Sequence, residues 1–131
     1  MYRAHTLVLT AAAFLIVVTS GCSDSTAPPD GADIAVTLDW SQPRDRGLRL
    51  VHWRLEMLGS SGVWTRCAWG SIHSATFTGR GYCHCSKGDR VRFVVYGHYS
   101  DSENECRIPH ELNSCLSGSP MITMPAEPGC W

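Results

Sequence analysis

Cysteine is the residue type that most constrains the fold of this chain. Seven cysteines occur in 131 residues, and six of them lie in the second half of the sequence. These six are an even number, and an even number of cysteines in an exported domain indicates a framework of disulfide bonds. At about 100–200 residues per domain, the chain has room for one domain, whose modest core such bonds would reinforce. The disulfide candidates are Cys67, Cys83, Cys85, Cys106, Cys115 and Cys130.

The seventh cysteine follows an apolar segment at the N-terminus. Residues 6–18 form an uncharged run, TLVLTAAAFLIVV, after the positive charge of Arg3. A membrane-spanning helix needs roughly 20 apolar residues, so this shorter run is typical of a secretory signal helix. The segment VTSGC, which ends at Cys22, resembles the lipobox of bacterial lipoproteins, with Thr19 in place of the usual leucine. The resemblance implies that residues 1–21 are a signal peptide and that Cys22 is acylated after cleavage.

The lipoprotein resemblance also implies a place in the bacterial cell envelope. The protein would face away from the cytoplasm, with acyl chains such as palmitate on Cys22 as its contact with the membrane. Ser23 favours the outer membrane in a host that has two membranes. Residues 22–33 are small, polar and proline-bearing, which predicts a flexible linker before a domain at 34–131. The alternatives are ordinary secretion and an uncleaved anchor.

The pairing of the six remaining cysteines stays open at this stage, because many connectivities are compatible with the sequence. Cys106 and Cys115 bracket a short polar stretch, RIPHELNS, and are therefore the best local pair. Cys83 and Cys85 are two residues apart, share one face of a strand, and are not expected to bond to each other. A Cys106–Cys115 bond would leave Cys67 and Cys130 to join Cys83 and Cys85 in some order.

A metal site is the alternative use of these cysteines. Cys83, His84 and Cys85 place two thiols and an imidazole close together, and Met121 and Met124 offer soft ligands for cuprous copper. Structural zinc needs a second closely spaced ligand pair, which the sequence lacks. We therefore expect disulfides and no metal site, with a periplasmic metal-binding protein as an alternative function.

Alternation of apolar and polar residues predicts a series of short strands. Glycines at 79 and 81 are expected to break the chain, and Gly70 with Ser71 to close a tight hairpin. Residues 100–120 predict a long, polar, irregular loop, with one helical turn near Pro109. The expected strands are 34–40, 48–58, 63–69, 72–78, 82–85, 90–99 and 121–124.

The same alternation assigns side chains to the core or to the surface. Val51 and Trp53 are expected to point inward, and Trp40 and Trp69 to lie in the core as well. Trp64 shares its strand face with Arg66, so both residues are candidates for exposure. Val91, Phe93 and Val95 are expected inward, and Arg90 and Arg92 outward.

Short strands separated by turns favour an all-β fold, a small antiparallel β-sandwich stapled by disulfides. Over residues 34–99 the order resembles an immunoglobulin-like or fibronectin type III domain. Leu38-Asp-Trp40 followed by Pro43 is similar to the family's strand with its core tryptophan. Three further segments resemble the strands that follow: Val51–Glu56, Ala75–Gly79 and Lys87–Tyr96. The resemblance implies a module that binds or spaces other domains, and it supplies no catalytic residues.

Charge and motifs narrow the class of function. The formal net charge is −1, so the chain has no general attraction for nucleic acid. No nucleophile, metalloprotease, phosphate-loop or dinucleotide motif occurs in the sequence. We therefore expect no enzymatic activity and no cofactor, and the sequence predicts a non-catalytic binding or interaction module.

The ligand of such a module is expected to be an envelope protein or a glycan. A carbohydrate-binding accessory domain is one alternative, because an exposed tryptophan or tyrosine beside arginine can stack on a sugar ring. The long loop at 100–120 is the expected contact surface. The candidate binding residues are Trp64, Arg66, Tyr96, His110 and Glu111.

Overall fold

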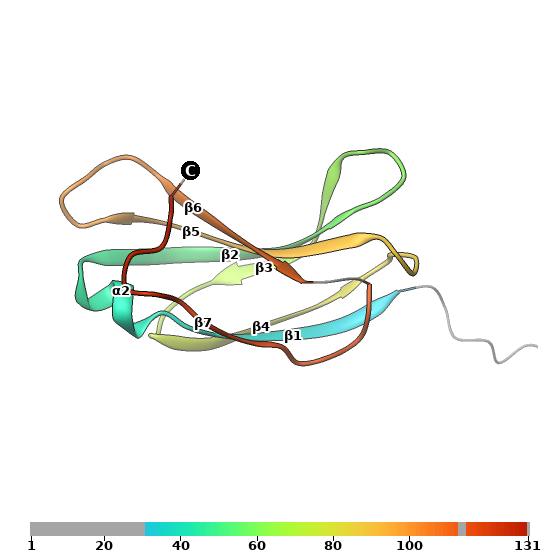
Figure 1. Ribbon diagram of the computed structural model, residues 1–131, viewed down its shortest axis with the longest axis horizontal. Helices are drawn as coiled ribbons and strands as arrows, with labels where there is room; N and C mark the ends of the chain where they lie inside the picture. The colour runs from blue at the N-terminus through green and yellow to red at the C-terminus, as the bar shows by residue number, and fades with distance from the viewer. Residues whose placement is uncertain (1–30, 113–114, 131) are drawn as a thin grey trace, which may run out of the picture.

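Two β-sheets face each other in a computed structural model that describes residues 31–112 and 115–130 (Figure 1). The predicted signal peptide, Cys22 and most of the predicted linker lie outside the described residues. Among the described residues, no helix is long and apolar enough to cross a membrane. The described residues form one short helix, α2 (Ser41–Asp45). The strands are β1 (Ala32–Asp39), β2 (Leu48–Leu58), β3 (Trp64–Ser71), β4 (Thr76–Cys83), β5 (Arg90–Tyr99), β6 (Cys106–Leu112) and β7 (Met121–Thr123).

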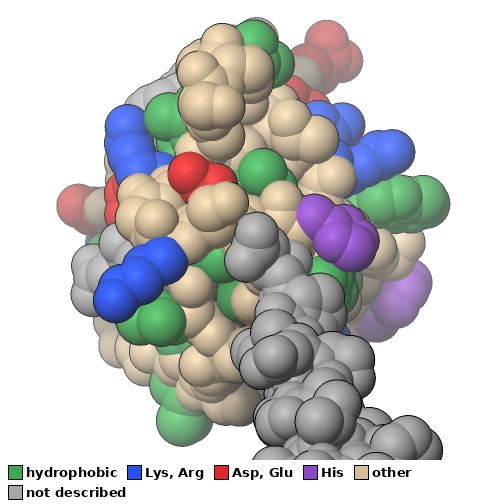
Figure 2. Space-filling view, turned by 90° about the vertical axis from the view of Figure 1, so that its right-hand side faces the viewer, with side chains coloured by type: hydrophobic (Ala, Val, Ile, Leu, Met, Phe, Trp, Pro, Cys, Tyr) green, Lys and Arg blue, Asp and Glu red, His purple; other side chains and the backbone are tan. Residues whose placement is uncertain are grey.

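The strands form a three-stranded sheet in the order β4-β1-β7 and a four-stranded sheet in the order β3-β2-β5-β6. All neighbouring strands are antiparallel except β1 and β7, which are parallel. The expected all-β sandwich is therefore confirmed. Figure 2 shows the end at which β1 begins, where charged, polar and hydrophobic side chains are intermixed.

The core lies between the two sheets and follows from strand alternation. Ile34 and Leu38 of β1 are 2% and 0% exposed and face the four-stranded sheet. Trp53 and Phe93 meet them from the opposite side, with ring centroids 5.4 Å apart. Burial of large aromatic rings is a major source of stability in a small domain. Trp40 is also buried, as expected, and its indole N–H donates to the carbonyl of Ser74.

Two glycines let the sheets approach each other closely. The expected break at these glycines is wrong, because Gly79 and Gly81 lie inside β4. A Cβ atom at Gly79 would lie 2.8 Å from Phe93, and one at Gly81 would overlap the Cβ of Ala68. Glycine is therefore used here for packing space, which is a known reason for glycine within a strand.

The segment expected to be one long loop contains a strand. Cys106–Leu112 pairs with β5 as the edge strand β6, and Pro109 lies opposite Val94. A proline is tolerated on an edge strand because no further strand needs its missing N–H. The predicted helical turn near Pro109 is therefore wrong, and irregular structure within 100–120 is confined, among the described residues, to 100–105 and 115–120.

Register shifts explain two residues whose predicted direction was wrong. The pairing of β2 with β5 shifts between Leu50 and His52, and Val51 is 51% exposed. The pairing of β2 with β3 shifts at Cys67, and beyond it Trp69 is 61% exposed. An extra residue at a bulge reverses the alternation of the side chains that follow it. The expected hairpin at Gly70 and Ser71 is also wrong, since β3 continues through Ser71.

Three disulfides cross-link the described domain. Cys67–Cys83 joins β3 to β4 and so connects the two sheets. Cys85–Cys115 joins the segments that follow β4 and β6, and Cys106–Cys130 joins the first residue of β6 to the segment after β7. Cys67–Cys83 is one of the pairs the sequence left open, but the predicted Cys106–Cys115 pair is wrong. A strand advances about 3.3 Å per residue, so β6 carries these two cysteines beyond disulfide reach.

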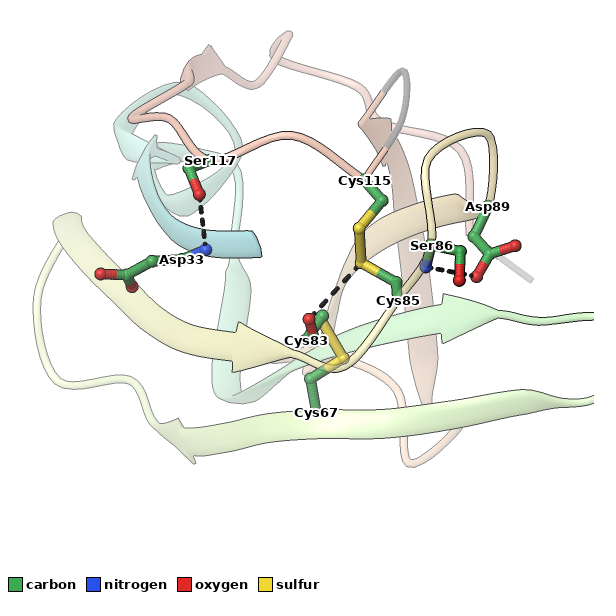
Figure 3. Close-up of a disulfide and its surroundings, with 8 residues drawn as sticks. All are labelled: Asp33, Cys67, Cys83, Cys85, Ser86, Asp89, Cys115 and Ser117. Atoms are coloured by element: carbon green, nitrogen blue, oxygen red, sulfur yellow. Dashed lines mark hydrogen bonds between the residues drawn. A yellow bond between two sulfur atoms is a disulfide. The ribbon is translucent and has the colours of Figure 1, made fainter. Parts of the chain in front are cut away.

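The first two disulfides lie side by side at one end of the sandwich (Figure 3). The Sγ of Cys85 is 3.5 Å from the carbonyl oxygen of Cys83. This is a packing contact and not a hydrogen bond, because a disulfide sulfur carries no proton. Nearby, the backbone N–H of Asp33 donates to Ser117 Oγ, which fastens the start of β1 to the segment before β7.

The close approach at β4 can be tested by adding one methyl group. We expect Gly81→Ala to lower the free energy of unfolding by about 1–3 kcal/mol, because the new Cβ overlaps Ala68. Gly129→Ala is the matched control, since a Cβ there meets no atom within 4 Å. Urea denaturation measures both, and equal midpoints for the two variants would contradict the packing described here.

Candidate binding face

The outward side of the four-stranded sheet, called here the outer face, is rich in arginine and aromatic residues. Cross-strand pairing sets its rows. Arg54 of β2 lies between Trp69 of β3 and Val94 of β5. In the next row Glu56 lies between Arg66 and Arg92, and Arg92 is in turn paired with Glu111 of β6. Side chains directly opposite each other on one sheet face are close enough to interact.

One end of the outer face is built around Trp64. The guanidinium of Arg92 lies 3.9 Å from the Trp64 ring centroid, and that of Arg90 lies 5.3 Å from it. Arg92 also donates to Glu56 over 2.8 Å, with side chains only 15% and 8% exposed, and Arg90 pairs with Glu111. These two arginines are therefore neutralised by carboxylates and held against an aromatic ring, which makes this end rigid.

The other end of the outer face is open. Arg66 lies 5.6 Å from the Trp69 ring centroid, and Arg54 lies 5.2 Å from the centroid of Tyr96. His52 stacks on Tyr96 with centroids 4.5 Å apart and planes 9° apart. Within the described part of the chain, neither Arg54 nor Arg66 forms an ion pair with a carboxylate.

A groove of about 390 Å³ runs between these residues and is called here the Trp69 groove. Its volume is within the range of roughly 300–1,000 Å³ that is usual for ligand sites. Trp69 is 61% exposed, so much of its indole surface is available to a ligand. The residues that line the groove are Val51, His52, Arg54, Arg66, Trp69 and Ser71.

The structure brings four of the five candidate binding residues onto the outer face. Trp64, Arg66 and Glu111 are partly or fully exposed there, whereas Tyr96 is 6% exposed and acts as a buried support for its neighbours. His110 lies on the other face of β6, where it is paired with Phe93 of β5. Adjacent residues of a strand point to opposite faces, so His110 and Glu111 cannot share a site.

His110 is instead a mostly buried side chain. Its Nε2 atom is buried without a hydrogen-bond partner. Loss of solvation lowers the pKa of His110 below its ordinary value, which favours the neutral imidazole. This residue therefore belongs to the interior beside β5 and not to the binding face.

Sequence reasoning missed the two residues that define the open end. Arg54 follows the inward-pointing Trp53, so alternation turns it outward, but nothing in its strand shows that it lies beside an exposed tryptophan. Trp69 was assigned to the core because the bulge at Cys67 is invisible to a simple alternation of polar and apolar residues. One sequence signal could have indicated the site. The segment WTRCAW, residues 64–69, places Arg66 between two tryptophans.

Described residues also line two hollows beside the sandwich. One, of about 230 Å³, adjoins the Trp69 groove at Val51 and His52 and is flanked by Glu103 and Glu105 of the β5–β6 connection. The larger, of about 510 Å³, opens between the sheet edges at β6 and β7 and is lined mainly by aliphatic residues such as Ile34 and Leu116. The larger hollow has fewer groups that could select a ligand, so the Trp69 groove is the better site.

The structure also bears on the metal alternative. Cys83 and Cys85 are both in disulfides, so their sulfur atoms are not thiolate ligands. The described residues contain no cluster of three or more His, Cys, Asp or Glu side chains that could hold a metal ion. The alternative site at Cys83, His84 and Cys85 therefore lacks its two thiolates in this structure.

Comparisons with known proteins add no assignment of their own. No family model matches the chain, and neither a curated protein nor a solved structure matches it. The chemistry of the outer face is therefore the basis for proposing a function.

The two ion pairs of the outer face should differ in their contribution to stability. Glu56→Ala leaves the part-buried Arg92 without its carboxylate, so we expect a loss of about 1.5–3 kcal/mol in the free energy of unfolding. Glu111→Ala removes the same charge from an exposed pair and should cost at most about 1 kcal/mol. Urea denaturation at neutral pH measures both. An equal loss in the two variants would show that burial does not set the strength of the Glu56–Arg92 pair.

Proposed function

We propose that this protein is a lipid-anchored, extracytoplasmic binding module that carries no catalytic machinery. The observation that carries the proposal is the outer face of the four-stranded sheet, where Trp69 is exposed between two arginines that have no carboxylate partner in the described residues. Exposed tryptophan and arginine are the residue types most enriched at binding hot spots. The face is built on paired strands and not on loops, so it is held in one geometry.

The anchor at Cys22 is proposed from the signal-like segment and the lipobox resemblance. Three disulfides in the domain support an oxidising, extracytoplasmic compartment. β1 begins at one end of the sandwich (Figure 1), so a tether joined there leaves the outer face pointing sideways and accessible. The binding face and the proposed membrane contact are therefore at different parts of the molecule.

Carbohydrate is the ligand class that the geometry favours over a metal. The indole of Trp69 can stack on the apolar face of a sugar ring, and Ser71 and His52 beside it offer hydrogen-bonding groups for hydroxyls. The resemblance to fibronectin type III domains implies a module that binds or spaces other domains, which is compatible with a non-catalytic binding role.

Acylation at Cys22 is tested by partitioning. We expect the wild-type chain to partition into the detergent phase of a Triton X-114 extract, because acyl chains contribute about 0.8 kcal/mol per buried CH₂. Cys22→Ser should move the chain to the aqueous phase. Ser20→Ala keeps Cys22 and is the control, with no change expected. A wild-type chain that stays in the aqueous phase, or that carries no acyl mass in mass spectrometry, would contradict the lipid anchor.

Binding at the outer face is tested with a panel of purified envelope and plant polysaccharides on the detergent-extracted full chain. We expect Trp69→Ala to weaken binding by about tenfold or more, as for a central aromatic contact. Met121→Ala, which removes an 83% exposed apolar side chain from the three-stranded sheet, should leave affinity unchanged. If no polysaccharide binds, or if Trp69→Ala binds as tightly as wild type, the proposed glycan-binding face is wrong.

A further inference from the structure

We infer that the Trp69 groove binds an acidic polysaccharide, with Arg54 and Arg66 pairing with a sugar carboxylate and Trp69 stacking on the ring. The inference rests on the proposed function and names the ligand class of the same face. Its starting point is a contrast between arginines of one sheet. Arg90 and Arg92 each have a carboxylate partner, whereas Arg54 and Arg66 have none among the described residues.

The two unpaired guanidiniums can reach one anionic group. Arg54 is opposite Trp69 and Arg66 is opposite Glu56, so the two arginines are diagonal neighbours on adjacent strands. Diagonal neighbours lie about 7–8 Å apart, a distance that long side chains bridge easily. Both arginines line the Trp69 groove. Glu56 does not compete for them, because it is held by Arg92 over 2.8 Å.

Arginine is the residue best suited to this task. Its planar guanidinium presents paired N–H donors that match both oxygens of a carboxylate. The ring contacts described above also limit where each guanidinium lies, since Arg54 is over Tyr96 and Arg66 is 5.6 Å from the Trp69 centroid, which still leaves the Trp69 side chain 61% exposed to a sugar. Less conformational freedom is lost on binding when a charged side chain is already positioned.

The surroundings of the groove favour an acidic sugar polymer over a polyanion that lacks ring faces. The neighbouring hollow is flanked by Glu103 and Glu105, so negative charge borders the groove on that side. A polyanion without ring faces, such as poly-glutamate, could pair with the two arginines but could not stack on the indole. A polysaccharide instead presents its carboxylates beside ring faces that can stack on the exposed indole of Trp69.

Isothermal titration of the detergent-extracted full chain tests the inference with three probes: polygalacturonate, neutral dextran and poly-glutamate. We expect polygalacturonate to bind at least about tenfold more tightly than either of the others, a difference of about 1.4 kcal/mol. Equal binding to dextran would show that charge is not recognised. Equal binding to poly-glutamate would show that the sugar is not recognised. Either result would overturn the inference.

Variants connect this selectivity to the groove. Arg54→Gln and Arg66→Gln should each weaken polygalacturonate binding about tenfold, as expected for a charge-assisted contact. Arg80→Gln makes the same charge change on β4 of the three-stranded sheet and should change affinity less than about twofold, since a distant exposed charge is screened by salt. Arg66 is exposed, so its substitution leaves the fold intact even if Arg54→Gln is unstable.

The outcomes separate the two levels of the proposal. If Trp69→Ala abolishes binding but both arginine variants bind polygalacturonate as tightly as Arg80→Gln does, the acidic-ligand inference fails and the glycan-binding face stands. If Trp69→Ala and the arginine variants all bind as wild type does, both the inference and the proposed function fail.

Discussion

The disulfide between Cys67 and Cys83 is the constraint on which the outer face depends. It joins edge strand β3 to β4 of the opposite sheet, and Cys67 is the residue at which the register of β3 shifts. The shift brings Trp69 to the same side of the sheet as Arg66, where an unbroken alternation would have buried the indole. A covalent bond at the bulge therefore fixes the arrangement of the residues that form the proposed site.

Packing beneath the sheet supports the same arrangement. Trp53 and Phe93 stack in the core, and the glycines of β4 bring the three-stranded sheet within contact of them. A domain of this size buries only a modest core, so close sheet packing and covalent cross-links together hold the sandwich. The Glu56–Arg92 pair then braces the other side of the sheet and positions Trp64.

The sequence was informative about where the long strands lie. The strands expected at 48–58 and 90–99 match β2 and β5 residue for residue, because each is a run of ten or eleven residues rich in apolar side chains and bounded by turn residues. Alternation cannot reveal an inserted residue, so Val51 and Trp69 were assigned to the wrong side. Alternation also cannot show that a glycine lies within a strand to make space for close packing. For this reason the single strand β4 was predicted as two strands separated at Gly79 and Gly81.

The candidate site was only partly predictable for the same reason. Alternation correctly predicted that Trp64 and Arg66 share one face of β3. The strand that pairs with β3 is set by the topology of the sheet, and a local sequence pattern does not reveal it. Residues 106–112 were expected in a loop, and their pairing with β5 is what brings Glu111 to the outer face and turns His110 inward. The cysteine pairs were likewise decided by the distance that β6 spans.

The central claim is that a ligand sits on the outer face at Trp69. The most direct test is a ¹⁵N NMR titration of the tryptophan indole N–H signals with oligogalacturonate. The account predicts a shift of the Trp69 signal and no shift of the Trp40 signal, since the Trp40 indole is buried and donates to Ser74 over 2.7 Å. A Trp69 signal that does not move at saturating ligand, or shifts confined to the three-stranded sheet, would contradict the claim.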